Sequence, residues 1–154
     1  MQRPRIGDVY EIATAARLAY AQYTHDTDGG RFGEVLRVLD GIHTRRPASF
    51  DGVPTRYVVL YPLRQLAARR ILDLELVVNA AVPPAAREFP VFRNGTPGPD
   101  GKVVVWWLWD GREETRVGAL APEQRALPFF EVLNPEALRE AIETGWTPAT
   151  DPRT

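Results

Sequence analysis

Residues 5–12 read RIGDVYEI and residues 18–25 read LAYAQYTH. The first segment opens with a Gly-Asp turn and continues into a short run of β-branched and aromatic residues, a composition typical of strands. The second segment carries tyrosines at positions 20 and 23. A third run of this kind spans Phe32 to Leu39, and turn formers such as Asp28-Gly29-Gly30 separate the runs. The simplest arrangement that these runs predict is three successive antiparallel strands.

The middle of the chain predicts two further strands with a short helix between them. Arg56 to Tyr61 carries apolar residues on both faces, which suits a central strand. Proline is favoured at the first position of a helix, and the apolar residues after it recur with helical spacing, so Pro62 to Arg70 is expected to be a short amphipathic helix. Leu72 to Leu76 alternates leucine with carboxylate, the pattern of a strand with one buried and one solvated face. Leu74 is therefore expected in the core.

The next part of the chain predicts a loop and a hairpin. The segment from Asn94 to Gly101 is too rich in proline and glycine to extend a sheet. Lys102 to Trp109 is rich in β-branched and aromatic residues, which indicates a strand. Asp110-Gly111 is a turn signal that pairs this strand with Glu114 to Leu120 as a hairpin.

A closing helix is predicted from its end signals and its apolar face. Asn134 is expected to be the N-cap, Pro135 the first helical residue and Gly145 the residue that ends the helix. The apolar face consists of Leu138, Ala141 and Ile142. Residues 147–154 contain two prolines and are expected to fray.

The chain has 154 residues, the length of one domain that can bury a core without disulfides or metal. We expect an α+β, β-rich fold, either a strongly curved antiparallel sheet or a small SH3-like barrel, of about six or seven strands with two helices packed against it. Residues 1–146 are predicted to form a single domain, followed by a frayed C-terminal tail at 147–154.

The net charge limits the classes of partner, and the cysteine content bears on the cellular compartment. A formal net charge of −1 supplies no global field to attract nucleic acid or an anionic membrane, so neither is an expected partner. The chain has no cysteine, which agrees with a reducing compartment. No apolar run lies near residue 1, so no signal peptide or membrane span is expected and the predicted location is the cytoplasm.

No constellation of catalytic residues is visible in the sequence. His25 and His43 are the only histidines, and the residues after His25 lack the His-x-Asp spacing of the iron facial triad, so no metal site is expected. Ser49, the only serine, has neither a nucleophile elbow nor an adjacent base. The sequence therefore predicts no enzyme, no cofactor and no small-molecule substrate.

Two segments carry residues that suit binding to a protein partner. The loop from Thr24 to Arg31 has more acidic residues than a turn requires, and such groups can form ion pairs with the basic cleft of a partner. On a regular strand Trp107 and Trp109 project to one side while Trp106 and Leu108 project to the other, so one side can be a binding surface and the other core. Burial of both sides is the alternative. The candidate partner-binding residues are His25, Asp26, Asp28, Arg31, Trp107 and Trp109.

Four of these segments also carry a resemblance to a known family. The segments Gly7-Asp8-Val9-Tyr10, Ala19 to Tyr23, Phe32 to Val38 and the turn Tyr61-Pro62-Leu63 together resemble the immunity protein family numbered 26. The resemblance covers the first half to two-thirds of the chain. It implies a non-enzymatic inhibitor that acts in bacterial competition by binding a cognate protein toxin tightly and blocking it. The family carries no defined set of binding residues, so none is transferred.

Two other functional classes remain open beside immunity. One is a general protein-binding or structural module. The other is an SH3-barrel ribonuclease toxin, for which Thr24 with Arg31 is the only pair that the sequence offers, and which a near-neutral charge disfavours.

Overall fold

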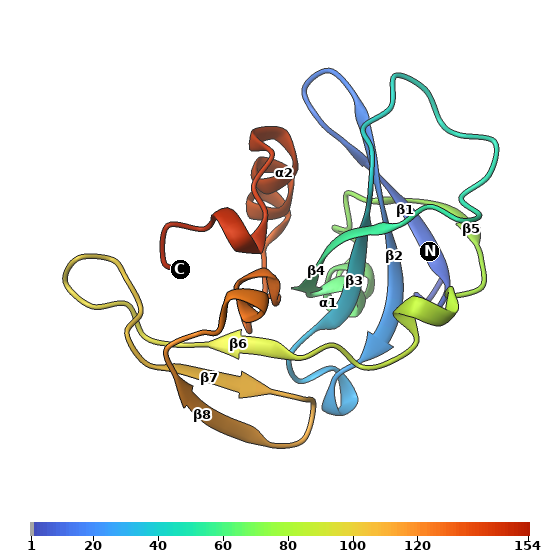
Figure 1. Cartoon of the computed structure of the whole chain (residues 1–154). Coiled ribbons are helices and arrows are strands. Elements are labelled where there is room, and N and C mark those ends of the chain that lie inside the picture. Colours follow the sequence, from blue (N-terminus) through green and yellow to red (C-terminus); the bar gives the residue numbers. More distant parts are fainter. Residues whose placement is uncertain (1) are drawn as a thin grey trace.

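The structure is a computed structural model that describes residues 2–154, in which eight strands form two antiparallel sheets accompanied by two α-helices and four short 3-10 turns (Figure 1). The expected α+β, β-rich fold is confirmed. The SH3-like barrel is wrong, because the larger sheet is open: its strand order is β4-β3-β2-β1-β5, and the outer strands do not pair with each other.

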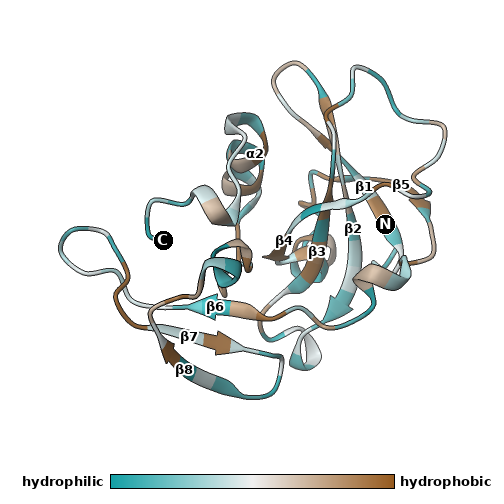
Figure 2. Ribbon diagram, in the orientation of Figure 1, coloured by the Kyte–Doolittle hydropathy of each residue, from teal (hydrophilic) through white to brown (hydrophobic). Residues whose placement is uncertain are grey.

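The larger sheet contains four of the expected strands. These are β1 (Asp8–Ala13), β2 (Leu18–Asp26), β3 (Glu34–Leu39) and β4 (Thr55–Tyr61). Each pairs antiparallel with the next. Arg56 to Tyr61, expected to be a central strand, lies in β4, an outer strand of the sheet. Its two apolar faces are instead buried in two separate core clusters, one on each side of the sheet. Figure 2 shows β3 as a largely apolar strand, and every residue of β3 is buried, which suits its place inside the sheet.

The fifth strand differs from the expectation. β5 spans Glu75–Asn79 instead of Leu72 to Leu76, and it pairs with β1 from Glu75 onward. Leu74 is buried as expected, at 8% exposure, but Leu76 is 38% exposed on the edge strand. The alternation misled because Leu72 and Leu74 pack against the core before the chain joins the sheet.

One face of the larger sheet is covered by both helices. α1 (Leu63–Ala68) contributes Leu63, and α2 (Pro135–Thr144) contributes Leu138 and Ile142. The closing helix has the predicted ends: the side chain of Asn134 accepts a hydrogen bond from the Ala137 backbone N–H, and Gly145 adopts a left-handed conformation with φ of 71°. The sheet residues in this core include Tyr10, Ile12, Tyr23, Leu36, Val38, Tyr57 and Val59.

The opposite face is covered in part by the second sheet. β6 (Phe92–Asn94), β7 (Trp106–Trp109) and β8 (Glu114–Gly118) form it in that order, and the predicted hairpin is β7 with β8. Phe92 and Trp109 pack there against Val35 of β3 and Leu60 of β4. The expected strand from Lys102 begins only at Trp106, because the residues before it form the end of a loop. Figure 1 shows this sheet lying across one end of the larger one.

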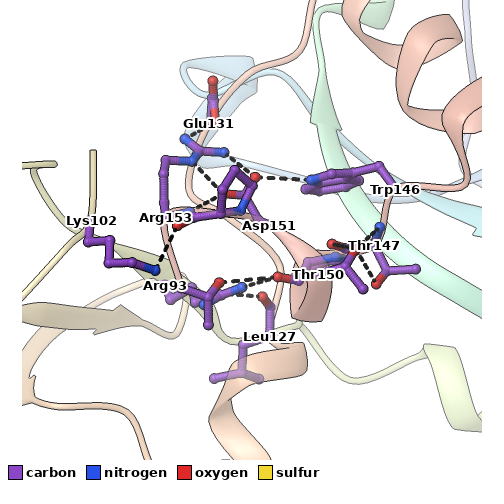
Figure 3. A network of polar contacts seen from close by, with 12 residues as sticks. Arg93, Lys102, Leu127, Glu131, Trp146, Thr147, Thr150, Asp151 and Arg153 are labelled. Atoms are coloured by element: carbon purple, nitrogen blue, oxygen red, sulfur yellow. Dashed lines mark hydrogen bonds and ion pairs between the residues drawn. The ribbon is translucent and has the colours of Figure 1, made fainter. Parts of the chain in front are cut away.

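Residues 147–154 do not fray in the structure. They form a 3-10 turn at Pro148–Thr150, and two hydrogen bonds from the buried Arg93 of β6, to Pro148 and Thr154, tie the segment down. The Arg93 acceptors are the Leu127 and Pro148 carbonyls and the Thr154 hydroxyl. Figure 3 shows Arg93 and Leu127 within this polar network, beside Asp151 and Arg153. Asp151 is buried and accepts hydrogen bonds from Arg153 and Trp146. The two prolines suggested a loose end, but specific polar contacts outweigh that tendency.

Candidate functional site

The turn between β2 and β3 is held by hydrogen bonds with one of its own side chains. Thr27 holds it together: its hydroxyl donates to the Gly33 carbonyl at 2.6 Å and accepts from the Phe32 backbone N–H at 3.0 Å. Gly33 has φ of 76°, and a Cβ there would stand 2.7 Å from the Tyr61 carbonyl oxygen. Only glycine fits this position without strain, because any side chain would meet the Tyr61 backbone.

Four side chains lock the turn to helix α1. Arg64 of α1 contacts Asp26 at 3.1 Å through Nη2 and the buried Glu34 at 2.9 Å through Nε. The Arg64 backbone N–H also donates to Glu34 at 3.0 Å, and the Tyr23 hydroxyl donates to Asp26. Burial, followed by the Asp26 carboxylate, raises the pKa of Tyr23, so its phenol stays protonated and donates. The hydrogen bond that Arg64 donates to the Glu34 carboxylate raises the pKa of Arg64.

Two charged side chains of the turn remain free to meet a partner. Asp28 and Arg31 approach each other at 3.9 Å, and their side chains are 70% and 71% exposed. An ion pair that is so exposed contributes little to stability. Arg31 and Arg64 also line a depression of about 780 Å³ that continues over Gln65 and Val132. We call the surface formed by Asp26, Asp28, Arg31 and Arg64 the turn surface.

His25 is held away from the turn surface. The pairing of β2 with β3 shifts by one residue between Tyr23 and His25, and such an irregularity changes the direction of a side chain. One ring nitrogen of His25 lies 2.8 Å from the Thr24 hydroxyl and the other lies 2.8 Å from the Arg87 carbonyl. The ring also meets Phe89 edge to face. His25 therefore joins the turn to the segment that leads into β6.

The tryptophans do not alternate as a regular strand would place them. Trp106 and Trp109 are buried, whereas Trp107 is 37% exposed, and the pairing of β7 with β8 shifts between Trp106 and Trp107. Trp109, at 8% exposure, packs against Phe32, Phe89, Phe92 and Phe130 and is core instead of surface. Trp107 instead lines a separate hollow with Asn94 and Glu114.

The structure thus gathers four of the predicted residues on or beside one turn and separates the other two. His25 and Asp26 are the last two residues of β2, and Asp28 and Arg31 lie in the turn that follows. Trp109 packs against Phe32 of the turn, and Trp107 lines the separate hollow beside Asn94 and Glu114. Sequence reasoning did not find Glu34 and Arg64. The signal for Glu34 was a carboxylate at the start of a strand whose other residues are mostly apolar, a position where a charge needs a partner.

Comparison with family models, with curated proteins and with solved structures finds no match. Within residues 2–154, no group of three or more histidine, aspartate and glutamate side chains is arranged to hold a metal ion. Neither helix in that range has the length and apolar character needed to cross a membrane.

Proposed function

We propose that this chain is a non-catalytic binding protein that neutralises a cognate protein toxin, as its resemblance to the immunity family implies, and that the toxin binds the turn surface. We assign the binding surface to this turn because its charged side chains are exposed while its backbone is held by hydrogen bonds. Asp28 and Arg31 are more than two-thirds exposed, yet they stand on a backbone that Thr27 and the buried Glu34 hold in place.

A rigid turn with free charges suits tight and selective protein binding. Little conformational entropy is lost on binding when the loop is already ordered. Exposed charges of both signs speed the encounter and reject wrong partners more than they add affinity. Asp26 has a different role, because Arg64 and Tyr23 already bind it. Asp26 is therefore expected to position the turn, and Asp28 and Arg31 are expected to contact the toxin.

The proposal expects a gene for a secreted toxin beside this one, and the experiment uses the toxin domain that such a gene encodes. Co-expression of the chain is expected to rescue growth of cells that express the toxin domain, and calorimetric titration is expected to show a one-to-one complex. The test variant is Asp28→Lys with Arg31→Glu, which reverses both charges and leaves the net charge unchanged. We expect it to weaken binding at least tenfold with an unchanged melting temperature.

A matched control is available on the turn between β7 and β8. Arg112→Glu with Glu113→Lys makes the same charge reversals on two exposed residues outside the turn surface. This control is expected to bind as the unmodified protein does. Equal weakening by both double variants would show a general charge effect and would exclude the turn surface. No rescue and no complex with the neighbouring toxin domain would overturn the immunity function and favour a general protein-binding module.

A further inference from the structure

Arg37 is a buried cation on the face of the larger sheet that the second sheet partly covers. It lies on β3 between Gln22 of β2 and Val58 of β4, and it is 4% exposed. Val35 and Leu39, two residues away on either side, belong to two separate apolar clusters. Arg37 therefore occupies a polar gap between two parts of the core.

The neighbours of Arg37 leave its charge unneutralised. Nε donates to the Gln22 side-chain oxygen at 2.7 Å, and Nη1 donates to the Val53 carbonyl at 3.1 Å and to the Thr55 hydroxyl at 3.3 Å. No carboxylate among residues 2–154 forms an ion pair with it. Burial lowers the pKa of the guanidinium, which records the cost of a charge placed there without a counter-ion.

One nitrogen of Arg37 has no acceptor in the part of the chain that the structure describes. Nη2 makes no hydrogen bond to residues 2–154. Within these residues, the polar side-chain atoms that are fully enclosed and have no hydrogen-bond partner are the Tyr57 and Tyr61 hydroxyls, so Nη2 is not fully enclosed. Nη2 therefore keeps contact with solvent. In Arg93, the other large buried cation, all three nitrogens donate to protein acceptors and two rings pack against the guanidinium. Arg37 thus has one nitrogen without an acceptor among the described residues, whereas every nitrogen of Arg93 has one.

Arg37 lines a cavity of about 370 Å³ whose other walls are mostly apolar. This volume lies in the range of sites for small organic ligands. The Thr55 hydroxyl accepts from Arg37 and donates to no atom of the described residues, so its own hydrogen is free. The exposed Glu88 stands in the lining as the one carboxylate. The apolar lining includes Val58, Phe89, Val91 and Leu127.

We propose that this cavity binds a carboxylate carried by an apolar group, with Arg37 Nη2 and the Thr55 hydroxyl as the donors to its two oxygens. A monoanion matches one guanidinium, whereas a phosphate dianion would need more cationic groups than the cavity offers. The apolar walls receive the body of the ligand and exclude water, which strengthens the ion pair. This site is independent of the turn surface, and the two proposals fail separately.

The experiment titrates the ¹⁵N-labelled protein and follows the Arg37 Nε–H signal together with the heat of binding. The small probes are phenylacetate and its neutral amide, phenylacetamide. N-acetyl-Leu-Phe as the free acid and as the amide tests whether the end of a peptide chain can supply the same group. We expect saturable binding of phenylacetate, at least tenfold weaker binding of phenylacetamide and a shifted Arg37 signal with the acid alone. Binding of the peptide acid would assign the site to a chain end, and its failure to bind would assign the site to small organic acids.

Two variants test the geometry without removing Arg37. Thr55→Val deletes the free donor on an exposed strand residue, and we expect about tenfold weaker binding of phenylacetate. Glu88→Gln removes the one negative charge in the lining, and we expect binding to tighten by a few-fold. Thr115→Val makes the same substitution as the first variant on an exposed residue of β8 and is expected to change nothing. If phenylacetate fails to bind at millimolar concentration, if the amide binds equally well, or if Thr55→Val binds as tightly as the unmodified protein, the proposal is overturned.

Discussion

The ring of Phe32 meets the ring of Trp109 edge to face, with centroids 5.5 Å apart. Phe32 belongs to the turn between β2 and β3, and the guanidinium of Arg31 lies 5.1 Å from the centre of the same ring. Trp109 belongs to the second sheet. The second sheet therefore supports the turn surface, and the position of Arg31 depends on packing with residues far along the chain.

Trp109→Ala should destabilise the protein by about 3–5 kcal/mol, because it removes a buried ring from a cluster of four phenylalanines. Trp107→Ala should cost less than about 1 kcal/mol, because that side chain is partly exposed in a shallow hollow. Denaturant melts followed by circular dichroism measure both values. Similar losses from the two variants would mean that β7 does not bury its residues as described.

Leu74→Ala should destabilise by about 2–5 kcal/mol, since Leu74 belongs to the core beneath the helices. Leu76→Ala, on the exposed edge strand β5, should stay within about 1 kcal/mol. The free energies of unfolding in urea give the comparison. A regular strand from Leu72 to Leu76 would bury both leucines and make the two losses equal, so the pair of variants separates the two registers.

Asp151 should make the stability depend on pH in acid. Burial alone would raise the pKa of its carboxyl, but hydrogen bonds from Arg153 and Trp146 outweigh burial and hold the pKa below the ordinary 3.8. The unfolded chain therefore binds the proton more readily than the folded one. The stabilisation is complete at pH values above 3.8 and is lost as pH falls through the folded pKa.

The measurement for Asp151 compares the protein with Asp151→Asn in thermal melts from neutral pH down to strong acid. At neutral pH the variant should be less stable by about 1.5–3 kcal/mol, the usual value of hydrogen bonds to a charged group. The difference should shrink as the carboxyl of the unmodified protein becomes protonated. A difference that stays constant across this range would show that the charge of Asp151 contributes nothing.

Asn134→Ala should destabilise by about 1 kcal/mol, because the Ala137 backbone N–H loses its acceptor at the start of α2. Asn134→Asp retains an acceptor at the same place and favours the positive end of the helix, so it should keep or slightly raise the stability. Thermal melts at neutral pH rank the three proteins. A loss from Asn134→Asp as large as that from Asn134→Ala would exclude capping as the role of Asn134.

The sequence predicted an element correctly where the residues of one short segment alone determine its backbone conformation. The ends of α2 are an example: Asn134, Pro135 and Gly145 each fix the backbone through their own chemistry. The strands of the larger sheet up to β4 were predictable for the same reason, since glycine-rich turns and β-branched runs identify them.

The features that the sequence did not reveal depend on pairing between distant residues. The exposure of Trp107 follows from a register shift against β8, which no pattern within residues 106–109 contains. Leu76 is exposed because β5 pairs only with β1. Glu34 and Arg64 form their ion pair across 30 residues of chain, and each alone looks like an ordinary surface charge. Arg37 likewise shows its character only when its neighbours on β2 and β4 are known.

The contacts of Arg93 set an order for folding during synthesis on the ribosome. Every strand of the larger sheet has been made once Asn79 is translated, and translation proceeds at about 5–20 residues per second, so that sheet can pair early. Arg93 gains two of its three acceptors only when Pro148 and Thr154 have emerged. Until then, closing the second sheet would enclose a cation that lacks two of its three acceptors. The nascent chain is therefore expected to carry an open second sheet, with its aromatic residues within reach of chaperones, until the segment around Pro148 arrives.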